Sequence, residues 1–176
     1  MALFAGITEA KTATFNGHKI EHILYNGIEV FKSIFNVFKN GVLNENCTMS
    51  GEFEIADEQL FIEIRVAEDE QHSTAQGFIE MDVTDFSRLI VSGEYYSYRG
   101  LENDGDCAIM YRVDESFNTL FTNTPESNDF TLEIDTSEKT GACTFSMICS
   151  TTGGANIESN HDQCYTGCYI NEIRLE

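Results

Sequence analysis

The sequence predicts an all-β protein: an antiparallel β-sandwich of jelly-roll or Greek-key type, preceded by a small N-terminal β-meander. Most segments alternate apolar and polar residues, and no window of ten or more residues shows the 3.6-residue period of a helix. Phe and Tyr, which favour strands, number 13 and 7, and there is no Trp. Asn-Gly, a strong signal for a tight hairpin turn, occurs at 16–17, 26–27 and 40–41.

Residues 1–33 are predicted to form a small N-terminal unit that serves as an attachment or assembly segment. Around the first two Asn-Gly pairs we expect a three-stranded meander with strands Thr12–Phe15, His18–Tyr25 and Ile28–Phe31. Such a unit is too small to bury a core of its own, so it should pack on a larger body. The third Asn-Gly pair then turns the chain into the main domain, residues 34–176.

About eight strands are predicted in the main domain, each with one face in water. They are Gly51–Ala56, Leu60–Val66, Gly77–Val83, Ser87–Tyr98, Cys107–Val113, Asp129–Asp135, Ala142–Ser150 and Tyr169–Leu175. In the last of them, Ile173 and Leu175 alternate with polar neighbours. Half-polar strands imply antiparallel sheets with one solvated side.

The longer connections between these strands are expected to be polar loops, at 67–76, 100–106, 116–128 and 151–167. The connection at 151–167 would carry the chain across to the last strand, as a Greek-key sandwich requires. An up-and-down barrel stays open as the alternative, because the number of strands does not separate the two.

The charge balance excludes some partners. The chain has 10 Lys and Arg against 30 Asp and Glu, a net charge of -20. Such a surface repels phosphate, so neither nucleic acid nor an anionic membrane is expected as a partner. No apolar run approaches the roughly 20 residues of a membrane-spanning helix, and the N-terminus lacks the basic region of a signal peptide. We therefore expect assembly in a cytoplasm.

The six cysteines are expected to be mostly free thiols, because no signal peptide directs the chain to an oxidising compartment. Cys143 and Cys149 lie on one face of a predicted strand with Phe145, so we expect them in the core. Cys164 and Cys168 are close enough for a local disulfide in an oxidising medium, and their state stays open. A zinc site is not expected, because His161 is the only further ligand near that pair.

The most suggestive binding feature is the segment Glu94-Tyr95-Tyr96-Ser97-Tyr98. On a strand, Tyr96 and Tyr98 share one face and Tyr95 takes the other. Exposed tyrosines stack on sugar rings or anchor protein interfaces, so Tyr95, Tyr96 and Tyr98 are the predicted ligand-contacting residues. Packing at the sheet surface, or contact with another subunit, is the alternative.

No catalytic residue and no cofactor is predicted. The chain lacks a nucleophile elbow, a P-loop and a zinc-protease motif, and paired carboxylates are too common in so acidic a chain to indicate a hydrolase. A glycan-active hydrolase stays open as a minor alternative. The loop 102–106 has the oxygen ligands of a calcium loop in Asp104 and Asp106, but no later glutamate completes the pattern, and a solvated turn is the alternative.

Three stretches together resemble structural proteins of bacteriophages. His22–Phe31, built around a Tyr-Asn-Gly turn, resembles a short β segment of minor structural proteins from phages of Firmicutes. Asp82–Ser92 resembles a strand–turn–strand unit of their tail-associated sandwiches, and Tyr169–Glu176 resembles their closing strand.

This resemblance implies a non-enzymatic virion component with a jelly-roll domain that decorates a tail or capsid or recognises a host-surface glycan. It also implies contact with other virion proteins and a homo-oligomer, such as a trimer. Because the chain ends within a strand, attachment is expected through residues 1–33. The alternative function is a carbohydrate-binding module of a secreted or surface protein, since the same architecture serves both roles.

Overall fold

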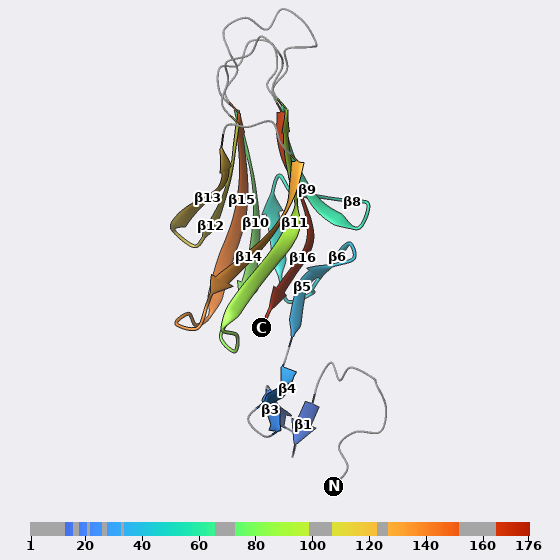
Figure 1. The fold of residues 1–176 in the computed structure, drawn as a ribbon, viewed down its shortest axis with the longest axis vertical. Coiled ribbons are helices and arrows are strands. Elements are labelled where there is room, and N and C mark those ends of the chain that lie inside the picture. Colours follow the sequence, from blue (N-terminus) through green and yellow to red (C-terminus); the bar gives the residue numbers. More distant parts are fainter. Residues whose placement is uncertain are drawn as a thin grey trace, which may run out of the picture.

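A computed structural model describes strands within residues 13–32 and the segments 34–65, 73–98, 107–122, 127–151 and 165–176. Two antiparallel sheets face each other as a sandwich (Figure 1). Every regular element in these segments is a strand, which confirms the predicted fold class. In the part of the chain so described, no helix is long and apolar enough to cross a bilayer.

One sheet has seven strands and is built around β16. Its members are β14 (Ser127–Asp135), β11 (Arg88–Tyr98), β16 (Tyr165–Leu175), β5 (Phe35–Lys39), β6 (Val42–Leu43), β9 (Gln59–Arg65) and β8 (Glu54–Ala56). On one side β16 pairs with β11 from Tyr165 to Leu175. On the other side it pairs first with β9 and then with β5.

The other sheet has five strands, in the order β13 (Ser116–Thr122), β12 (Cys107–Val113), β15 (Ala142–Thr151), β10 (Ser73–Asp82) and β7 (Thr48–Gly51). From β9 to β16, consecutive strands lie in opposite sheets, apart from the β12–β13 hairpin. Such crossovers define a Greek-key sandwich, so the up-and-down barrel is excluded. The predicted crossover into the last strand is confirmed, because β15 and β16 belong to different sheets.

The core lies between the sheets and follows the alternation in the sequence. Ile79, Leu89, Phe145, Ile173 and Leu175 are completely buried there. Burying a side chain of this size contributes about 1.5–3 kcal/mol, so the facing rows hold the two layers together. The thiols of Cys143 and Cys149 are buried among them, as predicted.

Two of the predicted segments are wrong in the main domain. The loop predicted at 116–128 contains β13, an edge strand that pairs with β12 through a register shift at Ile109/Met110. That irregularity breaks the alternation that would have revealed the strand. The strand predicted at 51–56 is divided: Gly51 ends β7, whereas 54–56 form β8 in the opposite sheet.

Two strands are four residues longer than predicted at their N-terminal ends. β10 begins at Ser73 and β16 at Tyr165, so both extend into segments expected to be loops. The tight turn predicted at the third Asn-Gly pair is confirmed between β5 and β6. Asn40 and Gly41 have φ angles of 51° and 73°, as such a hairpin turn requires.

The N-terminal strands form two separate hairpins. β1 (Ala13–Phe15) pairs with β2 (His18–Ile20), and β3 (His22–Tyr25) pairs with β4 (Ile28–Lys32). The predicted three-stranded meander is therefore wrong. Its middle strand is divided in two, and each half pairs across its own Asn-Gly sequence rather than bridging both neighbours. A separate attachment role for residues 1–33 stays a prediction.

Candidate functional site

Aromatic side chains gather on the solvent-facing side of the seven-stranded sheet, where β11, β16 and β9 run side by side. Tyr98 pairs with Tyr165, and Tyr169 pairs with Phe61. Tyr96 of β11 lies between the Tyr98–Tyr165 pair and the Tyr169–Phe61 pair along the strands. Because alternate residues of a strand point to the same side, all these rings lie on one face. We call Phe61, Tyr96, Tyr98, Tyr165 and Tyr169 the aromatic row.

The rings of the aromatic row contact one another without a break. Ring centroids are 4.8 Å apart for Phe61 and Tyr169, and 5.6 Å apart for Tyr169 and Tyr96. The row continues from Tyr96 to Tyr165 at 6.0 Å and from Tyr165 to Tyr98 at 5.0 Å. These spacings are those of favourable aromatic pairs. The result is an amphipathic surface that crosses three strands.

Gly167 makes room for the ring at the centre of the row. A Cβ atom at position 167 would lie 2.3 Å from the hydroxyl oxygen of Tyr96 and 2.5 Å from its Cζ. Any larger residue on β16 would therefore displace the ring. The Tyr96 hydroxyl donates a hydrogen bond of 2.5 Å to Oε2 of Glu63 on β9. Burial, followed by this bond to a carboxylate, raises the pKa of Tyr96 well above its usual value.

A guanidinium completes the upper part of the row. The Arg65 guanidinium lies 5.3 Å from the centroid of the Tyr165 ring and pairs with Glu63. The Arg65 side chain is 63% exposed, whereas that of Glu63 is 14% exposed. The Nε–H group of Arg65 donates to Glu63, so a ligand on the surface can reach the N–H donors of the two terminal nitrogens, while the carboxylate orients the guanidinium.

A pocket of about 430 Å³ adjoins the row at the edge of the sandwich, where the chain passes from β7 to β8. It is lined by Gly51, Glu52, Phe53, Glu54, Phe61 and Glu63. Phe53 is buried, and the Glu52 carboxylate accepts a 2.7 Å hydrogen bond from the backbone N–H of Gln76. Three glutamates and two phenylalanines line it, so the pocket combines carboxylates with aromatic rings.

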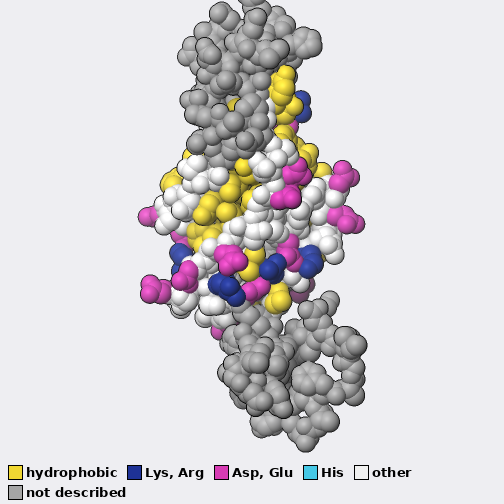
Figure 2. Space-filling view, in the orientation of Figure 1, with side chains coloured by type: hydrophobic (Ala, Val, Ile, Leu, Met, Phe, Trp, Pro, Cys, Tyr) yellow, Lys and Arg dark blue, Asp and Glu magenta, His cyan; other side chains and the backbone are white. Residues whose placement is uncertain are grey.

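The surface differs between the two ends of the sandwich. On the face drawn in Figure 2, Lys and Arg side chains gather among Asp and Glu at the lower end, and hydrophobic side chains reach the surface above them. The aromatic row belongs to the upper end, because it includes the last residue of β11 and the first of β16 (Figure 1).

The structure separates the three tyrosines predicted to contact a ligand. Tyr96 and Tyr98 are brought together in the aromatic row. Tyr95 lies on the opposite side of β11, packs against the core and has its ring 6.4 Å from that of Phe130.

Three other predicted residues lie outside the described segments: Asp104 and Asp106 of the calcium candidate, and Cys164. Within those segments no group of three or more His, Cys, Asp or Glu side chains could hold a metal ion. Cys168, the other half of the predicted cysteine pair, is a buried free thiol in the core.

Much of the site was missed by the sequence prediction. Tyr165 fell within a predicted loop, and Tyr169, Phe61, Glu63 and Arg65 carried no signal beyond ordinary strand alternation. Their meeting depends on the register of β16 with two partners that are far away in the sequence. One cue was present in the sequence: Tyr-Thr-Gly-Cys-Tyr at 165–169 places two tyrosines on the same strand face around a glycine.

Comparisons with known proteins find similarity only among solved structures: neither a protein-family model nor a curated protein matches the chain. A mutant family 29 carbohydrate-binding module has a TM-score of 0.42 and 10% identity, over 82% of this chain and 91% of that one. A family 61 module in complex with β-1,4-galactotriose has a TM-score of 0.41 and 11% identity, over 81% of this chain and 98% of that module. A structure of infectious bursal disease virus has a TM-score of 0.37 and 11% identity, over 89% of this chain and 37% of the viral chain. Likeness at this level assigns no function.

Proposed function

We propose that this chain is a non-catalytic carbohydrate-binding module that holds a glycan against the aromatic row. The observation that carries the proposal is the row itself. Rings from β9, β11 and β16 form an unbroken surface on the solvent side of the sheet, with a guanidinium and a carboxylate at its edge.

The row has the chemistry that a sugar requires. A pyranose ring has C–H faces that pack on aromatic rings and hydroxyl groups that both donate and accept hydrogen bonds. Tyr98 is 39% exposed and offers a ring for packing. Arg65 supplies donors, and the tyrosine hydroxyls supply donors and acceptors. Because these residues lie on paired strands, they need little ordering when a ligand binds.

Packing within the protein does not account for the whole row. Phe61 and Tyr169 stack on each other and cover the sheet, as surface aromatics often do. However, the row ends in an exposed tyrosine and an exposed arginine held in fixed positions by their neighbours. Packing within the protein does not explain why this end of the row is exposed to solvent.

The proposal is tested by screening the chain on a glycan array and measuring affinity for the best glycan by calorimetry. In Tyr98→Ala we expect affinity to fall about tenfold or more, as for an aromatic residue that carries much of the binding energy. Phe117→Ala is the matched control, because Phe117 is 62% exposed on β13 of the other sheet. Its affinity should equal that of the parent chain. Absence of binding to every glycan would overturn the proposal.

The virion role implied by the resemblance to phage proteins stays a prediction, as do the homo-oligomer and the location in a virion. A glycan-binding surface is compatible with that role, since a virion component that recognises a host would use the same chemistry. The proposal requires only the residues of the aromatic row.

A further inference from the structure

Carboxylates flank the lower end of the aromatic row in strand register. Glu94 pairs with Tyr169, and Glu54 pairs with Phe61, so the stacked pair of rings lies between two acidic residues. Asp129 on β14 pairs with Glu94 and adds a third acidic residue in line with the other two across the sheet. The side chains at one level across neighbouring strands share a face, so these charges border the surface that would hold the ligand.

Positive charge does not balance these carboxylates. Arg65 is the basic residue at the row, and its charge is matched by Glu63. At the opposite end of the sheet, Lys39, Arg88 and Arg174 have acidic partners of their own. The described part of the row therefore has an excess of negative charge, and the net charge of -20 adds to it.

The pocket beside the row combines this charge with aromatic rings. Glu52, Glu54 and Glu63 line it together with Phe53 and Phe61. Glu54 is exposed, and its carboxylate bonds no other described residue. Ring faces attract cations, and a carboxylate beside them adds a direct Coulomb attraction. A protonated amine is the group that uses both features at once.

Building on the proposed function, we infer that the aromatic row binds a basic glycan, one that carries free amino sugars, and rejects anionic glycans. The rings hold the sugar faces, and the carboxylates along the row and in the pocket attract its ammonium groups. A uronic acid at the same position would place a carboxylate against Glu54 or Glu94.

The test uses three β-1,4-linked pentasaccharides with the same gluco backbone, made of glucosamine, glucose or glucuronic acid. Calorimetry at low salt should show that the glucosamine pentamer binds more tightly than the glucose pentamer. Each close contact between an ammonium group and a carboxylate should add about fivefold in affinity. The glucuronic acid pentamer should bind most weakly. The advantage of glucosamine should shrink in added NaCl, because salt screens exposed charges.

A pair of variants separates local charge from net charge. Glu54→Gln should weaken binding of the glucosamine pentamer several times more than binding of the glucose pentamer. Glu80→Gln is the control: Glu80 is exposed on β10 of the other sheet, and the substitution changes the net charge equally. This control should preserve the preference for glucosamine.

Several outcomes would overturn the inference while the proposed function stands. One is tighter or equal binding of the glucose or glucuronic acid pentamer. Another is an equal effect of Glu54→Gln and Glu80→Gln on the glucosamine pentamer. A third is binding to other glycans on the array but to none of the three pentamers. Only the absence of all glycan binding would remove the proposed function as well.

Discussion

Tyr96 is the residue on which the candidate site depends most. Its ring contacts the rings of Tyr165 and Tyr169 and lies over Gly167. Its hydroxyl binds Glu63, which in turn pairs with Arg65. One side chain thus joins the aromatic surface to the charged groups beside it.

Tyr96→Phe tests this link at the level of a single hydroxyl. The ring is kept, but the half-buried carboxylate of Glu63 loses its hydrogen bond from the phenol. We expect the free energy of unfolding to fall by about 1 kcal/mol, measured by urea denaturation. The control is Tyr111→Phe, whose hydroxyl bonds no other described residue, and it should cost less. An equal loss in both variants would show that the hydroxyl of Tyr96 has no special role.

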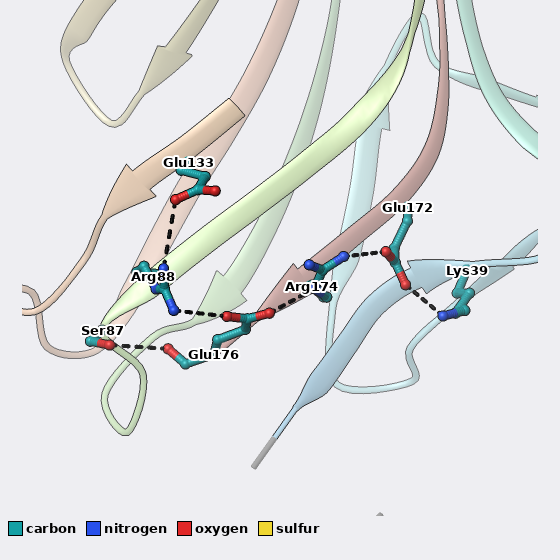
Figure 3. A network of polar contacts seen from close by, with 7 residues as sticks. All are labelled: Lys39, Ser87, Arg88, Glu133, Glu172, Arg174 and Glu176. Carbon is teal, nitrogen blue, oxygen red and sulfur yellow. Dashed lines mark hydrogen bonds and ion pairs between the residues drawn. The ribbon is translucent and has the colours of Figure 1, made fainter. Parts of the chain in front are cut away.

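At the scale of the element, β16 supports two different features. Its first half carries the aromatic row, and its second half carries a ladder of charges (Figure 3). Arg174 pairs with both Glu172 and Glu176. Glu172 also binds Lys39 of β5 at 2.6 Å, and Glu176 binds Arg88 of β11 at 3.2 Å. The ladder therefore ties the end of the central strand to both neighbours.

Arg174→Gln should destabilise the sandwich without touching the site. The side chains of Glu172 and Glu176 are only 18% and 13% exposed, so they would lose a shared cation in a partly desolvated position. We expect a loss of about 1–2 kcal/mol in the free energy of unfolding, and unchanged glycan affinity.

Arg88→Gln is the control for this ladder. The Arg88 side chain is 45% exposed, and its second partner, Glu133, is 61% exposed. Water screens such pairs, so this variant should lose less than about 1 kcal/mol. Equal losses in the two variants, measured in the same urea titration, would contradict the central position of Arg174 in the ladder.

At the scale of the whole molecule, buried thiols line the space between the sheets. Cys143 and Cys149 come from β15 of the five-stranded sheet, and Cys168 comes from β16 of the seven-stranded sheet. Burial raises the pKa of Cys143 to about 11. Burial also raises the pKa values of Cys149 and Cys168 well above the ordinary value of a thiol.

The sandwich should therefore lose stability as the solution becomes alkaline. Above about pH 8.5 the thiols of the unfolded chain release protons, while those of the folded chain keep them. The unfolded state then binds fewer protons, so the free energy of unfolding falls with pH, by up to about 1.4 kcal/mol per pH unit for each thiol.

Urea denaturation between pH 7 and pH 9.5, in the presence of a reductant, measures this slope. Cys149→Ala and Cys168→Ala should each lower the stability at pH 7, because they leave a cavity, but should each flatten the slope. A parent chain whose stability is constant up to pH 9.5, or variants with the parent slope, would contradict the expectation.

Prediction from the sequence succeeded where the signal is local. Alternation placed Cys143, Cys149 and Phe145 in the core, and Asn40-Gly41 predicted a hairpin turn. It failed where an irregularity disturbs the pattern, as in β13, whose pairing is shifted at Ile109/Met110. It also placed Tyr96 and Tyr98 on one face without showing which residues of other strands lie beside them.

The sequence by itself determined the class of fold, the crossover into the last strand and the faces that become buried, because the period of two is a local property of each strand. Only the tertiary structure decided that Tyr165 and Tyr169 of β16 would lie between β11 and β9. Register between strands far apart in the chain depends on how the whole core packs, and a shift of one residue would turn every ring to the other face. The aromatic row exists because that packing selects one register.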